Sequence, residues 1–280
     1  MTLINGQPAQ QVPTDDRGLA YGDGVFETIA VIAGEPGLWT RHYERLSAGC
    51  WLLGFPPPEA STLLDEIAAV TGHDTAIVRV TITRGSGGRG YRAPAEAQPR
   101  RIVSVAGIPG HPIAYWRDGV AVRTCDTRLP YRPALAGSKH LNRLEQVIAR
   151  SEWRDAAVPE GLMWDADGQY LMEGTMTNLF LRYGDELVTP PVRACGVEGV
   201  MRSEVVAERA AAGYPVREQS LSQADVLGAD EMFLTNSVIG LWPVRELDGM
   251  ALSQDWRCCR ELLARLTGRR AMLDWLGEGS

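Results

Sequence analysis

The spacing of hydrophobic residues divides the chain into short strands and amphipathic helices. β-Branched and aromatic residues cluster at 2–5 and 25–33, which predicts two strands. Tyr43, Leu46 and Cys50 recur at helical spacing, so a helix over about 41–53 should bury that face in a core. Further helices are predicted at about 59–70, 140–153, 201–212, 222–228 and 254–268. Further strands are predicted at about 76–83, 101–107, 119–125, 161–165, 170–173, 178–182, 187–189 and 231–235.

One break in this pattern predicts two domains. The stretch from Gly110 to Arg117 interrupts the alternation of strands and helices, with a glycine and a proline close together. We therefore expect an N-terminal domain at 1–113, a linker at 114–118 and a larger C-terminal domain at 119–280. In the helix predicted over 140–153, the apolar positions should face inward; these are Leu141, Leu144, Val147 and Ile148.

Composition excludes several classes of protein. With 45% hydrophobic and 22% charged residues, the chain is typical of a globular protein. A net charge of −7 argues against electrostatic binding to nucleic acid or to an anionic membrane. No uncharged apolar run approaches the ~20 residues that span a bilayer. The five cysteines include no Cys-x-x-Cys pair, so we expect reduced thiols in a cytoplasmic protein and no metal site.

Among the 28 basic residues, Lys139 is the single lysine. An arginine keeps its proton at any workable pH, whereas a lysine amine can lose it and then form a Schiff base with a carbonyl compound. Lys139 lies where an irregular segment is predicted to enter a helix. Composition alone leaves two interpretations equally open, a reactive amine or a surface lysine in a protein that favours arginine.

Three other stretches are suited to anions. Arg41 and Arg45 lie one helical turn apart and could hold an anion, although a solvated basic face is the commoner arrangement. The loop over 84–92 is rich in arginine and glycine, and could cradle an anion, bind nucleic acid or simply be flexible. The glycine turn over 196–199 leads into a helix, and a helix N-terminus favours phosphate. None of these signals is specific by itself.

Taken together, these features resemble the fold-type IV pyridoxal phosphate enzymes, which include aminotransferases for branched-chain and D-amino acids and 4-amino-4-deoxychorismate lyase. The resemblance covers nearly the whole chain. It lies in Tyr21-Gly22-Asp23-Gly24-Val25-Phe26-Glu27-Thr28, His42-x-x-Arg45-Leu46, Lys139, Glu173-Gly174-x-x-x-Asn178-Leu179-Phe180, Gly199-Val200-Met201-Arg202 and Thr235-Asn236-Ser237. It implies an α/β fold with a small N-terminal α/β domain and a larger C-terminal domain, whose β-barrel-like core is flanked by helices.

The resemblance also implies a role for each matching residue. Lys139 is expected to form the Schiff base with pyridoxal 5'-phosphate and to carry protons, assisted by Thr28. Glu173 is expected to partner the pyridine nitrogen. The remaining cofactor contacts are expected from Arg45, Asn178, the backbone N–H groups of Val200 and Met201, and Ser237. Met201 stands where the aminotransferases often have threonine.

Within the family, the stretches over 139–146 and 84–91 look like the lyase. The implied reaction converts 4-amino-4-deoxychorismate to 4-aminobenzoate and pyruvate in folate biosynthesis, and the implied assembly is a homodimer. Arg84, Arg89 and Arg92 are candidates for the substrate carboxylates. His140 is a weaker candidate base, because neighbouring helical residues point in different directions. The alternatives are an aminotransferase on the same fold and, more remotely, a non-catalytic anion-binding protein.

Overall fold

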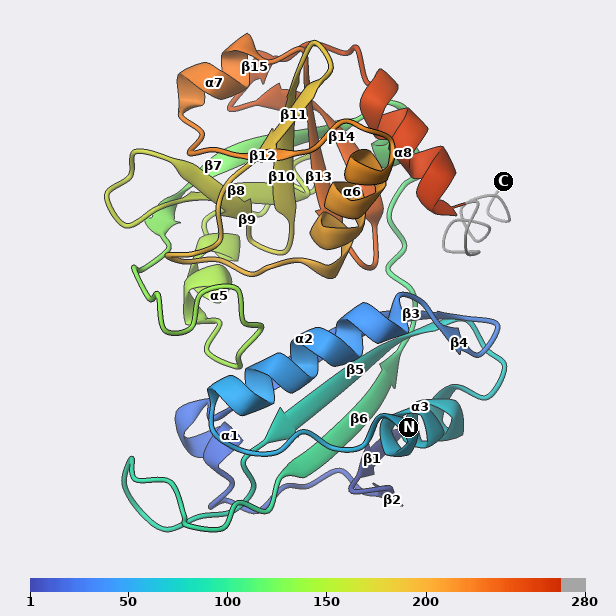
Figure 1. The fold of residues 1–280 in the computed structure, drawn as a ribbon, viewed down its shortest axis with the longest axis vertical. Helices are drawn as coiled ribbons and strands as arrows, with labels where there is room; N and C mark the ends of the chain where they lie inside the picture. Colours follow the sequence, from blue (N-terminus) through green and yellow to red (C-terminus); the bar gives the residue numbers. More distant parts are fainter. Residues whose placement is uncertain (268–280) are drawn as a thin grey trace. The chain divides into compact units, whose positions relative to one another are not determined.

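The computed structural model describes residues 1–267, which form two compact units. Unit 1 comprises Met1–Pro109 and Ser138–Asn142, and unit 2 comprises Gly110–Gly137 and the chain from Arg143 onward. Each unit contains a β-sheet with helices, so the predicted mixed α/β class is confirmed (Figure 1). Residues 268–280 of the predicted larger domain, including the last residue of the helix expected over 254–268, lie outside the described residues.

Unit 1 is a six-stranded sheet with the order β2-β1-β6-β5-β3-β4. Its strands are β1 (Thr2–Ile4), β2 (Gln7–Pro8), β3 (Gly24–Ile32), β4 (Glu35–Pro36), β5 (Ala76–Thr83) and β6 (Arg100–Ala106). Its helices are α1 (Arg17–Tyr21), α2 (Trp39–Leu52) and α3 (Ala60–Thr71). The predicted apolar face of the first long helix is confirmed, because Leu46 and Cys50 of α2 lie in the core.

The two faces of this sheet differ because side chains alternate along a strand. Val25 and Ile29 of β3 face the same side as Val78 and Ile82 of β5, and α2 and α3 cover that side with leucine and isoleucine side chains. Residues at the intervening positions, such as Phe26, face the other side. The alternation therefore separates an apolar core from a face that can carry polar side chains.

Unit 2 contains a nine-stranded sheet, in which eight strands follow the order β12-β11-β10-β13-β14-β7-β8-β9 and β15 pairs with β14. The strands are β7 (Val120–Arg128), β8 (Glu160–Trp164), β9 (Leu171–Gly174), β10 (Asn178–Tyr183), β11 (Glu186–Thr189), β12 (Arg217–Glu218), β13 (Glu231–Asn236), β14 (Gly240–Leu247) and β15 (Met250–Ala251). The helices are α4 (Ala114–Arg117), α5 (Leu144–Arg150), α6 (Val200–Ala211), α7 (Gln223–Gly228) and α8 (Arg257–Thr267).

Residues 114–118, for which the sequence predicts a linker, are mostly helical. Helix α4 occupies four of them, and its Trp116 is buried in the unit 2 core. The indole N–H of Trp116 donates to the carbonyl of Ile239 at 2.9 Å. Because a large aromatic side chain is anchored in this way, the segment is part of unit 2.

The helix predicted over 140–153 is shorter than expected. Helix α5 begins at Leu144, and residues 138–142 instead form an extended segment that pairs with β3 of unit 1. The inward orientation predicted for three apolar residues is wrong in this chain, because Leu144 is 71% exposed, Val147 58% and Ile148 57%. Helical periodicity correctly places such residues on one face, but it does not show whether the same chain covers that face.

Candidate active site

Lys139 is held by an extended segment that continues the sheet of unit 1. The N–H of Phe26 donates to the carbonyl of Lys139 at 3.0 Å, and the N–H of Leu141 donates to the carbonyl of Gly24 at 2.9 Å. His140 forms an isolated antiparallel bridge with Val25, so it shares the core-facing side with that residue. Strand alternation then turns Lys139 to the opposite side, where its Nζ lies 4.6 Å from the centroid of the Phe26 ring.

Thr28 lies on the same face of β3 as Phe26, two residues along the strand. The structure therefore groups Lys139, Phe26 and Thr28 in unit 1. His140 is buried on the other face, next to α2. Strand alternation, and not the helix expected from the sequence, therefore directs His140 away from the face that carries Lys139.

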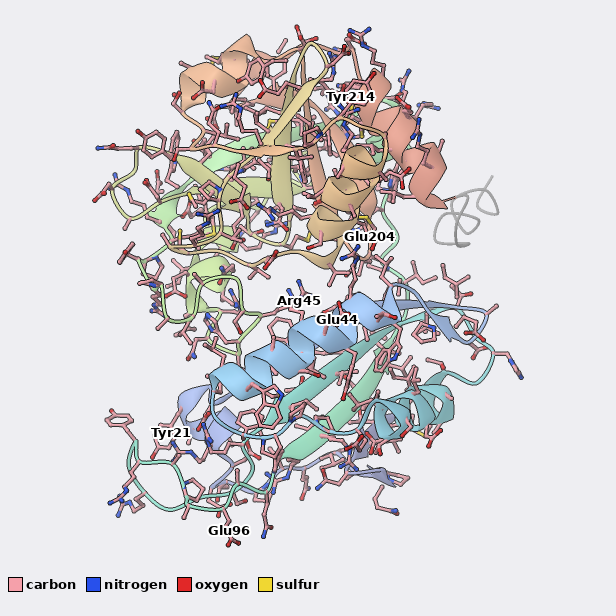
Figure 2. All side chains as sticks on the ribbon, viewed as in Figure 1. Tyr21, Glu44, Arg45, Glu96, Glu204 and Tyr214 are labelled. Carbon is pink, nitrogen blue, oxygen red and sulfur yellow. The ribbon has the colours of Figure 1, made fainter. Side chains whose placement is uncertain are left out.

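Arg45 on α2 (Figure 2) is fixed by a buried carboxylate on β3. Its Nε donates to Glu27 Oε1 at 2.8 Å and its Nη2 donates to Glu27 Oε2 at 2.5 Å, while His42 Nδ1 lies 2.7 Å from the same Oε2. Burial by itself would raise the pKa of Glu27, but the charge and hydrogen bonds of Arg45, with those of His42, lower it to about 2. Glu27 therefore remains charged and holds the guanidinium in a fixed orientation.

We expect the ion pair between Glu27 and Arg45 to stabilise the fold most above pH 4.5. The pKa of Glu27 falls from 4.5 in the unfolded chain to about 2 in the folded chain, so the contribution is complete above 4.5 and is lost as the pH falls through 2. The difference corresponds to about 3 kcal/mol at neutral pH. Urea unfolding of the wild type and Glu27→Gln should show a smaller stability gap at pH 3 than at pH 7. Equal gaps at both pH values would contradict this assignment.

The three arginines proposed for the substrate differ in their surroundings. Arg84 is buried, and its guanidinium donates to both carboxylate oxygens of Asp23 and to the carbonyls of Leu53 and Gly54. These contacts favour a structural role for Arg84. Arg89 and Arg92 are exposed in the loop between β5 and β6.

Arg79 is a cation that the sequence reasoning missed. It lies directly opposite Thr28 in the β3–β5 pairing, and its Cζ is 3.8 Å from the centroid of the Phe26 ring. Arg79 therefore lies on the same face as Thr28 and contacts the ring that also contacts Lys139. Its position in a strand with alternating polarity was visible in the sequence, but its cross-strand partner was not.

In unit 2, Glu173 is held by the turn that follows residue 195. It lies on β9 and is 4% exposed, and its Oε2 accepts a hydrogen bond from the N–H of Val197 at 2.7 Å. Gly196 has a φ of +85°, and a Cβ there would lie 3.0 Å from the same oxygen. Glycine at 196 therefore allows both the turn and the close approach to Glu173.

A second turn in unit 2 leads into α6 and has the form of an anion site. Gly199 is the N-cap residue of the helix, and as a glycine it has no side chain that could cap the N-terminal N–H groups. Asn178 holds the turn by donating from Nδ2 to the carbonyl of Val197 at 2.9 Å, and a Cβ at Gly199 would lie 1.9 Å from Asn178 Oδ1. Val200 and Met201 begin the helix, so their backbone N–H groups belong to its positively polarised end.

A buried hydroxyl group lies beside this turn. Thr235 is directly opposite Asn178 in the β10–β13 pairing, and it is 1% exposed. Within the described part of the chain, its Oγ1 has no hydrogen-bond partner. Ser237 follows two residues later, in a turn that Asn236 shapes by accepting from the N–H groups of Val238 and Ile239. A helix end with a glycine as its N-cap, the close approach of Asn178 to that glycine, and the buried Thr235 hydroxyl together fit a phosphate group.

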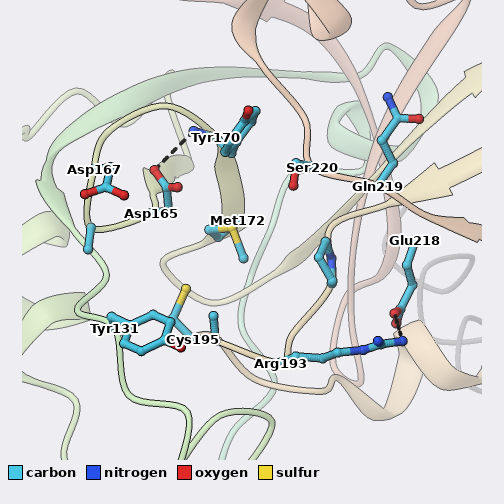
Figure 3. A pocket seen from close by; sticks show the side chains of 13 residues that line it. Tyr131, Asp165, Asp167, Tyr170, Met172, Arg193, Cys195, Glu218, Gln219 and Ser220 are labelled. Carbon is cyan, nitrogen blue, oxygen red and sulfur yellow. Dashed lines mark hydrogen bonds and ion pairs between the residues drawn. The ribbon is translucent and has the colours of Figure 1, made fainter.

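A pocket of about 680 Å³ lies elsewhere in unit 2 (Figure 3). Met172 and Cys195 are among its lining residues, and none of the predicted site residues is. Met172 immediately precedes Glu173 on β9, and adjacent strand residues face opposite sides. Glu173 therefore points away from this pocket, whose size does not identify it as the active site.

Comparisons with known proteins agree with these features. The family described as Amino-transferase class IV matches residues 24–247. The chain is 36% identical to aminodeoxychorismate lyase of Vibrio harveyi, over 87% of this chain and 90% of that protein. It is 32% identical to a putative branched-chain-amino-acid aminotransferase of Methanocaldococcus jannaschii, over 87% of this chain and 85% of that protein.

A crystal structure of 4-amino-4-deoxychorismate lyase from Pseudomonas aeruginosa is also similar. It superposes with a TM-score of 0.91 at 44% identity, covering 96% of this chain and 98% of that chain. The match extends over almost the whole of both proteins, as the resemblance in the sequence implies. The chain belongs to the class IV amino-transferase family.

Proposed function

We propose that this protein is a pyridoxal phosphate-dependent lyase that converts 4-amino-4-deoxychorismate to 4-aminobenzoate and pyruvate. The observation that carries the proposal is the placement of Lys139, the single lysine, on a paired segment that directs its amine to the face bearing Phe26 and Thr28. The relatives with 36% and 44% identity are both named as this lyase. Aminotransferase relatives match less closely, at 32% and 25% identity.

The residues present fit the cofactor. When bound, pyridoxal phosphate supplies an electron sink for negative charge that develops next to the substrate nitrogen. Lys139 would anchor it through a Schiff base, and the carboxylate of Glu173 would keep its ring nitrogen protonated. The N-terminal end of α6, with Ser237, Asn178 and the guanidinium of Arg45, would hold its phosphate.

Lys139 would also transfer a proton from the substrate ring to the departing enolpyruvate. After the substrate's own amino group has replaced it on the cofactor, the freed neutral amine of Lys139 would take the proton from C4 of the substrate. The C3–O bond to the enolpyruvyl group would then break as the ring becomes aromatic. The ammonium of Lys139, assisted by the hydroxyl of Thr28, would return the proton to the methylene carbon of enolpyruvate and give pyruvate. One acid–base group is sufficient, because aromatisation makes the elimination strongly favourable.

The direct test is release of 4-aminobenzoate from enzymatically prepared 4-amino-4-deoxychorismate, followed by its fluorescence after chromatography. We expect release by the purified holoenzyme and an equal amount of pyruvate. If the protein instead transfers an amino group from an amino acid to a 2-oxo acid and releases no 4-aminobenzoate, it is an aminotransferase. That alternative is favoured by the relative from Methanocaldococcus jannaschii.

We propose Arg79, with Arg89 and Arg92, for contact with the substrate carboxylates. Arg79 has the strongest support because it shares a face with Thr28 and the Phe26 ring. Replacing Arg79 with Gln should raise KM for the substrate by about 10- to 100-fold, the loss expected for a charged hydrogen bond of about 1.5–3 kcal/mol. Steady-state kinetics would measure this, with the exposed Arg117→Gln in unit 2 as the control. An unchanged KM would remove Arg79 from the site.

We further propose that the protein is a cytoplasmic homodimer. Three large apolar side chains on α5 are exposed in the single chain, and Tyr131 of the same unit is also 70% exposed. A second copy covering this face would remove a costly apolar surface from water. A monomer mass measured by light scattering would contradict the dimer.

The proposed cytoplasmic location is in keeping with the cysteines, because all five are buried free thiols, as expected in a reducing compartment. Cell fractionation would locate the protein directly.

Among residues 1–267, no helix is long and apolar enough to cross a membrane. In the same residues, no group of three or more histidine, cysteine, aspartate or glutamate side chains is arranged to hold a metal ion.

A further inference from the structure

Glu160 is a buried carboxylate that the proposed chemistry does not use. It begins β8 in unit 2 and is 0% exposed. No arginine or lysine in the described chain forms an ion pair with it. Burying a carboxylate without a counter-ion is costly unless hydrogen bonds replace its hydration. The hydrogen-bond donors around Glu160 therefore indicate which part of the structure this carboxylate stabilises.

Five donors surround this carboxylate, and four belong to the turn over 175–177. Oε1 accepts from the N–H of Thr175 at 3.0 Å, from its hydroxyl at 2.5 Å and from the N–H of Gly161 at 2.9 Å. Oε2 accepts from the N–H of Met176 at 3.1 Å and from the hydroxyl of Thr177 at 2.9 Å. One side chain thus accepts hydrogen bonds from four donors of this turn.

That turn joins two of the residues proposed to hold the cofactor. Glu173 precedes it at the end of β9, and Asn178 follows it as the first residue of β10. The carbonyl of Met176 also accepts a hydrogen bond from Asn236 Nδ2 at 3.2 Å. Asn236 in turn shapes the backbone around Ser237. Contacts therefore run from Glu160 through the turn to the residues proposed for the ring nitrogen and for the phosphate.

The turn also has little room to adjust. A Cβ at Gly174 would lie 2.2 Å from Thr177 Oγ1 and 2.8 Å from Glu160 Oε2. The N–H of Gly174 donates to the carbonyl of Thr177 at 2.7 Å, which closes the turn on itself. Because Glu173 is covalently bonded to Gly174, a shift of this turn must move the Glu173 backbone.

We propose that Glu160 is a positioning residue that sets the orientation of Glu173 and Asn178 toward the cofactor by fixing the 175–177 turn. The inference rests on the cofactor roles given under the proposed function. Glu160 itself need not touch the cofactor or the substrate. Its replacement should alter how the cofactor is held, in addition to any effect on folding.

The test compares Glu160→Gln with Glu231→Gln. Glu231 is a matched control, because it is also a buried strand glutamate of unit 2 that accepts backbone N–H groups, here from Cys258 and Cys259. In the Glu160→Gln variant, the new amide NH2 must face at least one backbone N–H, from either Met176 or Thr175, and neither can reverse its polarity. Both variants should have a lower Tm.

The cofactor readouts should separate the two variants. Glu160→Gln should bind pyridoxal phosphate about tenfold more weakly, the effect typical of lost outer-shell partners at metal sites. It should also shift the pH midpoint of the bound cofactor's visible absorption, since Glu173 is displaced from the ring nitrogen. Glu231→Gln should leave both quantities as in the wild type. Loss of Tm with unchanged cofactor affinity and midpoint in Glu160→Gln would overturn the proposal.

A milder pair of variants covers the case in which Glu160→Gln does not fold. Thr177→Val keeps the shape of the side chain but removes one donor to Glu160, and Thr177→Ser keeps the donor. Valine should weaken cofactor binding by about threefold or more, and serine should restore it. Equal affinities for the two variants would overturn the proposal. These readouts need no substrate, so a holoenzyme that binds cofactor but releases no 4-aminobenzoate would refute the proposed reaction alone.

Discussion

Replacing Lys139 with alanine should remove both the visible absorption of the purified protein and its lyase activity. The absorption depends on a covalent bond between the amine and the cofactor, and alanine has no amine. The rate should fall by at least about 10³-fold, within the range for loss of a positioned acid–base group. Absorption spectra and the 4-aminobenzoate assay would measure the two effects. A protein that keeps its colour without Lys139 would refute its central role.

Lys139→Arg is the matched control for charge. An arginine keeps a cation beside the Phe26 ring, where Lys139 Nζ lies 4.6 Å from the centroid, but it cannot lose its proton at workable pH. We expect Lys139→Arg to match the wild type in Tm and to be as inactive as Lys139→Ala. Substantial activity in the arginine variant would show that the charge alone is sufficient.

Replacing Glu173 with glutamine should leave the cofactor bound while turnover falls by about 10²-fold or more. The amide oxygen can still accept the hydrogen bond from the N–H of Val197, which lies 2.7 Å from Glu173 Oε2, so the turn should persist. The amide is neutral, however, and cannot hold a proton on the ring nitrogen of the cofactor. Cofactor content and kcat, measured on the same preparation, would separate binding from chemistry.

The outcome for Glu173→Gln also shows whether Glu173 acts on the ring nitrogen of the cofactor or only helps to bind the cofactor. A wild-type rate would show that the partner of the ring nitrogen lies elsewhere. Loss of cofactor together with activity would point to a binding role in place of an electronic one. Near-UV circular dichroism of the variant would establish that unit 2 keeps its packing, so that a fall in kcat can be assigned to the lost charge.

Most of the regular structure could be predicted from the sequence. Runs of β-branched residues indicated the long strands β3 and β5, and helical periodicity indicated α2, α3 and α6. These patterns are local, because they follow from how side chains alternate within one element. The family resemblance depended on short motifs with fixed spacing. One of them begins at Gly199, where a Cβ would lie 1.9 Å from Asn178 Oδ1, so the close approach of that side chain requires glycine.

Prediction from the sequence was weakest where a residue's surroundings depend on a distant partner. Contact of Arg84 with the substrate stays a prediction, and the structure adds that its guanidinium donates to Asp23 and to the carbonyls at the end of α2. Arg79 was overlooked, although pairing places it opposite Thr28. The helix predicted to begin near 140 was displaced by strand pairing with β3. No local pattern reports a cross-strand neighbour or an ion pair across 61 residues.

The sequence by itself determined that a single lysine stands among arginines and that motifs of one enzyme family surround it. Only the tertiary structure decided which way that lysine points, because the alternation of an extended segment beside β3 separates Lys139 from His140. It also decided which side chains hold others in place. Glu27 accepts hydrogen bonds from Arg45, and Glu160 accepts hydrogen bonds from the 175–177 turn. Such partners are set by packing between distant segments, where the cost of a buried, unpaired charge selects one arrangement.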